Sequence, residues 1–274
     1  MKKCVLFMAA ACLLTACSSA YDEEEIVTND EQDVTLTFSP YDQEPMTRTA
    51  TSIAGIVTSL DVWITDGEEI TTIHQSSSDN GFGSITVTLN KQKSYNIYAV
   101  GHKCATAATL TDGVISFPDD KVTHSMFYKA SFTPASTTSL SCLMNRIVAN
   151  FRLEITDEFP ADCSALRFTI EDVFDRWNVN TGGAHSLNRV STITYNGSSS
   201  IFNVYAIVTS ENTLHNITID ALDANNNILQ TRELTDVPLR NGYKTNYRGQ
   251  FFIDQAVTPS FTVDDWNDTS VINF

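Results

Sequence analysis

Apolar and polar residues alternate along much of this chain with a period of two. The pattern is clear where Val34, Leu36 and Phe38 are separated by Thr35 and Thr37. Successive side chains of a β-strand point to opposite faces, so this alternation predicts a strand with one buried face. The same alternation predicts strands in four further segments, at residues 85–89, 147–155, 217–220 and 261–263.

Other apolar runs are bounded by turn residues and are also candidate strands. Asn80-Gly81, Asn196-Gly197 and Asn241-Gly242 are typical of tight turns between strands. One short stretch, 53–60, has helical spacing and is compatible with a single turn before the next strand. The candidate strands of this second group lie at residues 60–65, 95–100, 127–132, 166–170, 201–208 and 249–253.

Many short strands joined by Gly and Asn turns predict an all-β protein. We expect two tandem antiparallel β-sandwiches rather than a parallel sheet, with about seven strands in each. A stretch rich in Pro, Ser and Thr at 133–139 lies close to the middle of the strand-bearing region. We therefore place an N-terminal sandwich at 34–140 and a C-terminal sandwich at 141–274.

The first 16 residues have the features of an export signal. Two lysines precede an apolar run at 5–14, and a run of about ten residues is too short to span a bilayer. The sequence Leu14-Thr15-Ala16-Cys17 resembles the lipobox of bacterial lipoproteins, in which the cysteine is lipidated and becomes the first mature residue. We therefore expect a signal peptide at 1–16 and a lipid anchor, such as palmitate, on Cys17.

The segment that follows the lipidated cysteine is polar and acidic. Residues 17–33 cannot bury a core, and we expect them to form a flexible tether. The acidic run resembles the surface-export signals of Bacteroidota lipoproteins, and a plain solvated linker is an equally good interpretation. The whole chain has a net charge of −16. Such an acidic chain is not expected to bind nucleic acid through its phosphates.

The cysteines and histidines suggest no catalytic or metal-binding chemistry. Beyond Cys17, the mature chain has Cys104, Cys142 and Cys163. An exported compartment permits one disulfide, for which Cys142 and Cys163 are candidates, and buried free thiols are about equally plausible. The histidines are scattered without metal-ligand spacing, and no nucleophile elbow or phosphate-binding loop is present. We expect no enzyme activity, no cofactor and no metal site.

The three tryptophans are candidates for stacking against a sugar ring. Trp63 lies in an apolar run and is expected in the core. Trp177 and Trp266 lie near the ends of expected strands, so a surface role stays open for them.

Several segments together resemble the fimbrillin superfamily of Bacteroidota type V pili, which includes stalk, tip and anchor subunits. The resemblance rests on the lipobox, the acidic tether and a first strand, and it spans most of residues 17–274. Its individual motifs are loose. They are Glu44-Pro45-Met46-Thr47-Arg48-Thr49-Ala50, Asp61-Val62-Trp63-Ile64-Thr65-Asp66-Gly67, Tyr95-Asn96-Ile97-Tyr98-Ala99-Val100-Gly101, Asn145-Arg146-Ile147-Val148-Ala149-Asn150-Phe151 and the expected strand at 261–266.

The resemblance implies two transthyretin-like sandwiches and a processing step. In stalk subunits of the family an Arg-specific protease cuts after an arginine behind the first strand, and Arg48 matches that position, with Thr49 as the new N-terminus. Removal of the first strand would open a groove that a neighbouring subunit fills with a strand of its own. An ordinary loop arginine is an equally good interpretation of Arg48. The tail beyond Trp266 is short for a donor strand, so the role of an anchor subunit is also compatible with the sequence.

The sequence thus predicts a surface-exposed, lipid-anchored protein of the outer membrane, or of a fimbrium if it is processed. Its expected partners are other fimbrial subunits, the membrane through its lipid and a host surface. The alternative is a surface glycan-binding lipoprotein of a nutrient-uptake system.

Overall fold

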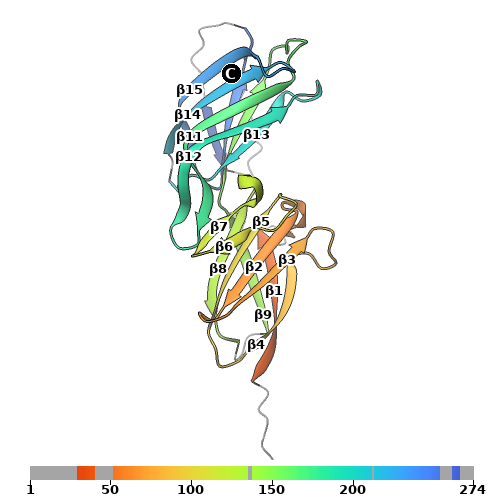
Figure 1. Ribbon diagram of the computed structural model, residues 1–274, viewed down its shortest axis with the longest axis vertical. Helices are drawn as coiled ribbons and strands as arrows, with labels where there is room; N and C mark the ends of the chain where they lie inside the picture. Colours follow the sequence, from red (N-terminus) through yellow and green to blue (C-terminus); the bar gives the residue numbers. More distant parts are fainter. Residues whose placement is uncertain (1–29, 41–51, 135–137, 212, 254–260, 266–274) are drawn as a thin grey trace, which may run out of the picture.

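The structure, a computed structural model, describes residues 30–40, 52–134, 138–211, 213–253 and the backbone of 261–265. These residues form two lobes stacked along the long axis of the molecule (Figure 1). Almost all regular structure is β-strand, joined by two short 3-10 turns, η1 (Ile53–Gly55) and η2 (Pro118–Asp120). The expected lipidation site Cys17 and the processing site Arg48–Thr49 lie outside the described residues.

The N-terminal lobe is a β-sandwich made from one folded sheet. Its strand order is β3-β2-β5-β8-β9-β1-β4. The sheet folds at β8 and β9, which pair only at Met126↔Arg146 and Phe127↔Asn145. The two layers enclose a core that includes Val34, Leu36 and Phe38. The bounds are β1 (Glu31–Pro40), β2 (Ser59–Thr65), β3 (Ile70–Ser76), β4 (Ser84–Asn90), β5 (Tyr95–His102), β8 (Met126–Phe132) and β9 (Ser139–Arg146).

The C-terminal lobe packs two sheets against each other. One has the order β13-β10-β16-β17; the other has the order β15-β14-β11-β7-β6, with β12 paired to β11. The core between them includes Phe151, Phe168 and Phe202. The bounds are β6 (Thr109–Thr111), β7 (Val114–Ser116), β10 (Ala149–Ile155), β11 (Ala165–Asn178), β12 (Gly182–Thr194), β13 (Ile201–Ala206), β14 (Thr213–Leu222), β15 (Ile228–Leu239), β16 (Tyr243–Gly249) and β17 (Phe261–Asp265).

The all-β sandwich architecture is confirmed, but the pairing is not purely antiparallel. β1 runs parallel to β9, and β10 runs parallel to β16. The expected boundary between residues 140 and 141 falls inside β9, and β10 opens the second group of sheets. The strands β6 and β7 come from the first half of the chain and lie at the N-terminal lobe (Figure 1), where they extend the sheet that contains β11.

Two local predictions were wrong for identifiable reasons. The expected strand at 147–155 begins at Ala149, because the chain passes from one lobe to the other just before it. The expected strand at 249–253 is a bend instead. The Asp157 carboxylate accepts the backbone N–H groups of Phe251, Phe252 and Ile253 at 2.6–2.9 Å, and the Arg232 guanidinium donates to the carbonyls of Phe251 and Ile253. These side-chain bonds replace a strand ladder.

A third apolar cluster joins the lobes. It contains Trp63 of β2, Phe127 of β8 and Ile207 after β13, with Trp177 of β11 packed against it. The rings of Phe127 and Trp177 are 5.7 Å apart. The long β11–β12 hairpin reaches the N-terminal lobe and pairs with β7 at Trp177↔Ile115 (Figure 1). The two lobes are therefore connected by both backbone pairing and a shared apolar interior.

Candidate functional site: the groove occupied by the first strand

The strand β1 fills a groove between two other strands of its lobe. On one side it pairs antiparallel with β4, from Glu31↔Asn90 to Thr37↔Ser84. On the other side it pairs parallel with β9, from Thr35↔Ser139 to Pro40↔Met144. It is therefore an interior strand of the sheet, although it is the first strand along the chain.

Apolar side chains of β1 close the core of the N-terminal lobe. Val34 and Leu36 are fully buried and Phe38 is 2% exposed. The Phe38 ring meets that of Tyr128 edge to face, with centroids 6.2 Å apart. Burying three such side chains contributes roughly 5–9 kcal/mol of hydrophobic free energy before chain entropy is subtracted. The period-two alternation of the sequence identified this buried face correctly.

Hydrogen bonds hold β1 at both ends of the groove. The backbone N–H of Phe38 donates to the carbonyl of Gly83 at 2.8 Å, and that of Thr35 donates to Thr138 at 3.0 Å. The Thr88 hydroxyl donates to the Asp33 carboxylate at 2.6 Å. Without β1, the facing edges of β4 and β9 would lose their backbone partners. Unpaired strand edges are the usual sites at which an additional strand binds.

Cys142 is on β9, one of the two strands that border this groove. Cys142 is opposite Phe38 in the β1–β9 register and is fully buried. Burial raises the pKa of its thiol to about 11 and raises that of the neighbouring Tyr128 phenol to about 12. Both groups are therefore neutral at physiological pH, and the thiol is shielded from solvent as long as β1 is in place.

All three described cysteines are free and buried. The proposed disulfide between Cys142 and Cys163 is not formed, because Cys142 faces the N-terminal core and Cys163 faces the C-terminal core. The alternative interpretation, free buried thiols, is the correct one for Cys104, Cys142 and Cys163.

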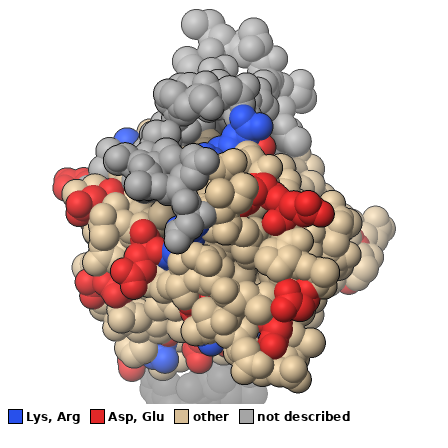
Figure 2. All heavy atoms as spheres, turned by 90° about the horizontal axis from the view of Figure 1, so that it is seen from above, with Lys and Arg blue, Asp and Glu red and all other residues tan. Residues whose placement is uncertain are grey.

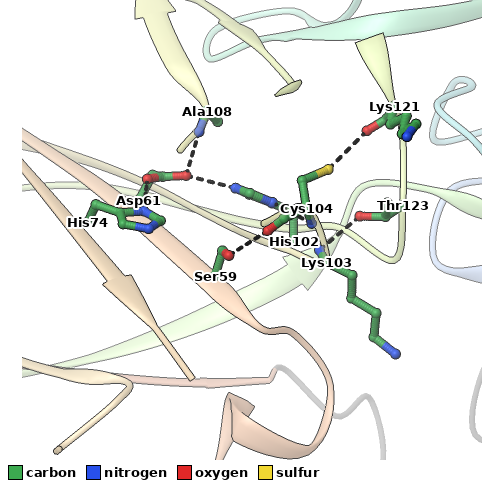
Figure 3. A network of polar contacts seen from close by, with 9 residues as sticks. All are labelled: Ser59, Asp61, His74, His102, Lys103, Cys104, Ala108, Lys121 and Thr123. Carbon is green, nitrogen blue, oxygen red and sulfur yellow. Dashed lines mark hydrogen bonds and ion pairs between the residues drawn. The ribbon is translucent and has the colours of Figure 1, made fainter. Parts of the chain in front are cut away.

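A second group of polar residues lies beneath the loop that follows β5 (Figure 3). The Asp61 carboxylate is 1% exposed. It accepts three hydrogen bonds, from His74 Nδ1 at 2.7 Å, His102 Nε2 at 2.8 Å and the Ala108 N–H at 2.8 Å. The amide of Cys104 donates to His102 Nδ1 at 3.0 Å, so that nitrogen acts as an acceptor and Nε2 is the donor to Asp61.

This network has the residue types of a catalytic site but lacks access to a substrate. His102 is fully buried and Cys104 is 8% exposed. The Cys104 thiol donates to the Lys121 carbonyl at 3.5 Å instead of facing a cavity. The network therefore has a structural role: its hydrogen bonds hold the loop after β5 against β2. Sequence reasoning missed Asp61, although a lone carboxylate in the apolar run of β2 was a signal that a buried partner was required.

Polar contacts also cross between the lobes. Arg189 of β12 donates to the carbonyls of Asp120 and Val122 at 3.0 and 3.4 Å. The His124 ring stacks on Tyr205, with centroids 5.8 Å apart, and its Nε2 accepts from Arg146 Nε at 3.1 Å. Burial, reinforced by the charges of Arg146 and Lys103, lowers the pKa of His124 to about 3. His124 is therefore neutral in the folded protein.

The tryptophans within the described residues do not form a surface platform. Trp63 is 2% exposed and lies in the interlobe cluster, as expected from its apolar run. Trp177 packs in the same cluster, so the surface role left open for it is not supported. Trp266 lies outside the described residues.

The described residues form neither a metal cluster nor a membrane-spanning helix. No group of three or more His, Cys, Asp or Glu side chains within the described ranges is arranged to hold a metal ion. In the part of the chain that the structure describes, we find no helix with the length and apolarity needed to cross a membrane. Acidic side chains are spread over the outer end of the C-terminal lobe, with fewer basic ones among them (Figure 2).

The sequence from residue 119 to 273 matches a family of unknown function (DUF6562). This match covers more than half of the chain. The protein belongs to this family. None of the curated proteins matches the sequence.

Solved structures share the fold at low sequence identity. A “putative adhesin” from Bacteroides ovatus has a TM-score of 0.52 and 15% identity, over 85% of this chain and 96% of its own. A “putative cell adhesion protein” from Bacteroides uniformis has a TM-score of 0.51 and 16% identity, over 87% and 100%. A structure of “putative polysaccharide binding proteins” from Bacteroides thetaiotaomicron has a TM-score of 0.52 and 10% identity, over 80% and 92%.

Proposed function

We propose that this protein is a fimbrial subunit of the cell surface with a structural and adhesive role, and that it assembles by β-strand complementation. The observation that carries the proposal is the position of β1. Among the described residues this strand is the first, it is interior to its sheet, and it supplies three buried apolar side chains to a lobe core. An adhesive role agrees with the names of two solved structures that share the fold.

The proposed assembly step is an exchange of strands. Cleavage after Arg48 separates β1 covalently from the rest of the chain. Departure of β1 then exposes the edges of β4 and β9 and the pockets of Val34, Leu36 and Phe38. An extended segment with alternating apolar side chains, supplied by another subunit, fills the same groove and restores both ladders. Repetition with a contact that does not close on itself produces a fibre.

The remaining parts of the proposal concern membrane attachment. Residues 1–16 serve as a lipoprotein signal peptide, and Cys17 carries the lipid that holds the protein at the outer membrane. Residues 17–30 then act as the tether that separates the lobes from the membrane; the expected tether at 17–33 is shorter because residues 31–33 already pair with β4. Replacing Cys17 by Ala should move the protein out of the membrane fraction.

The test compares cells that express the wild type and Arg48→Ala. Protein is recovered from outer membranes and from surface filaments, and its N-terminus and mass are measured. We expect wild-type filaments to contain chains that begin at Thr49 and resist denaturant, and Arg48→Ala to give only intact chains without filaments. Arg48→Lys is the matched control, because it keeps the positive charge but removes the Arg-specific cleavage site.

Thiol labelling provides an independent readout of β1 departure. Cys142 should react with a maleimide only after β1 has left, whereas Cys163 in the C-terminal lobe should stay protected. Peptide mapping by mass spectrometry distinguishes the two cysteines. In finished filaments Cys142 should be protected again, because the donated strand fills the groove. Intact wild-type chains in filaments, with no stage at which Cys142 reacts, would refute strand exchange and leave an anchor or a surface-binding protein.

A further inference from the structure

The strand β12 forms a long free border of the C-terminal lobe. It pairs with β11 along its length, from Ala165↔Thr194 to Asn178↔Gly182. Among the described residues no strand pairs with its other edge, although β13 of the opposite sheet lies close to it. Figure 1 shows β12 at the border of the sheet, with β11, β14 and β15 on one side of it.

This border lacks the features that usually protect a free strand. Natural edge strands are commonly guarded by charged side chains, proline or a bulge. His185 has a φ of 61° and interrupts the strand. A register shift places Glu171 and Asp172 of β11 opposite Asn188, so the extra residue is on β11, and β12 itself continues from 186 to 194. That run contains one charged residue, Arg189, whose guanidinium is turned inward to the carbonyls of Asp120 and Val122.

Two other borders of the described sheets, those of β15 and β3, carry more protection. The β15 border carries Arg232, Glu233, Asp236 and Pro238. The β3 border is covered by Gln75, whose side chain donates to the Ser84 carbonyl and accepts from the Gly83 N–H, at 3.0 Å in each case. The outward side chains of the β12 run are uncharged, so two copies can meet there in spite of the net charge of −16 of the chain.

The side chains of this run match a second copy of themselves. If two such strands lie antiparallel with Val190 at the centre, Val190 faces Val190 of the other copy. Leu187 then faces Ile193, and Arg189 faces Ser191. The outward polar residues also pair, Asn188 with Thr192 and Ser186 with Thr194. No like charges meet. The central pair is Val190 with Val190, and a Leu187–Ile193 pair forms three residues away on each side of it.

We propose that the protein forms a two-fold symmetric pair in which β12 of one copy lies antiparallel beside β12 of a second copy. The contact joins the sheets of two C-terminal lobes into one continuous sheet. Val190, which is 58% exposed, is its central residue. The interface is isologous and closes on itself, so it yields pairs and not a fibre. It uses the opposite lobe from β1 and does not depend on strand exchange.

The first experiment measures self-association of the mature chain, with Cys17→Ser to remove the lipid. Sedimentation is followed from micromolar to millimolar concentration for the wild type and two variants. Val190→Lys should weaken the association at least tenfold. Leu214→Lys is the matched control, because Leu214 is 64% exposed on β14, an interior strand of the same sheet. It should associate like the wild type.

A cross-linking experiment tests the register. Val190→Cys places two thiols opposite each other at the symmetry axis, and mild oxidation should yield a disulfide-linked dimer rapidly. Leu214→Cys should cross-link much more slowly. A wild type that is monomeric at millimolar concentration would overturn the proposal, as would equal cross-linking rates for the two cysteine variants.

Discussion

The buried Asp61 carboxylate allows a sharp stability prediction through the substitution Asp61→Leu. Three donors converge on this carboxylate, from His74, His102 and the backbone of Ala108, at 2.7–2.8 Å. Oδ2 accepts from His102 and Ala108, and Oδ1 accepts from His74. A leucine has the same branching as aspartate but no acceptor, so it leaves all three donors without this partner.

The magnitude follows from the burial of the three donors. His74 is partly exposed and can turn to water, so its loss costs little. His102 and the Ala108 amide are buried, and each unsatisfied buried donor costs about 1–3 kcal/mol. Two such donors give a loss of about 2–6 kcal/mol in the free energy of unfolding for Asp61→Leu.

The assay is urea unfolding at pH 7, followed by circular dichroism, with Asp112→Asn as the control. Asp112 lies in an exposed turn with a φ of 49°, which asparagine tolerates. The control should change stability by less than about 0.5 kcal/mol. A loss below about 1 kcal/mol for Asp61→Leu would refute the argument that three donors depend on this carboxylate.

Two further predictions concern Phe38 and His124. Phe38→Ala should lower stability by about 3–5 kcal/mol and speed maleimide labelling of Cys142, because it empties the pocket above that thiol; unchanged labelling in native buffer would contradict this arrangement. For His124, the folded pKa of about 3 lies below the value of 6.5 expected in the unfolded chain. Between these two values only the unfolded chain binds the proton, so the free energy of unfolding decreases as the pH falls from about 6.5 towards 3. His124→Phe should therefore lose about 2 kcal/mol less than the wild type between pH 7 and pH 4.5 in urea titrations; equal losses would contradict the assignment.

Most strands could be located from local pattern alone. The alternation at Val34, Leu36 and Phe38 identifies the buried face of β1, because the side-chain period of a strand is fixed by backbone geometry. The same applies to β4 and β14, where β-branched residues alternate with polar ones. In contrast, β16 was missed, since Tyr243–Gly249 is polar and its one fully buried side chain, Thr245, carries no apolar signal.

Which strands pair, and in which direction, was decided by the tertiary structure. The parallel alignment of β1 with β9 places Phe38 beside Cys142. The two residues are about a hundred positions apart in the sequence, so no local pattern predicts that they are neighbours. Likewise, β7 joins β11 because the apolar cluster around Trp63 and Trp177 draws the two lobes together. The three donors to Asp61 come from β3, β5 and the loop after β5, and only the folded chain brings them together.

The sequence by itself therefore determined the fold class, the face of β1 that is buried and the absence of a recognised catalytic motif, because these depend on residues close together in the chain. The groove, the free border of β12 and the pinned loop at Asp61 depend on which distant segments pack together. That choice is made by the burial of apolar surface across the whole chain, and only the folded arrangement reveals it.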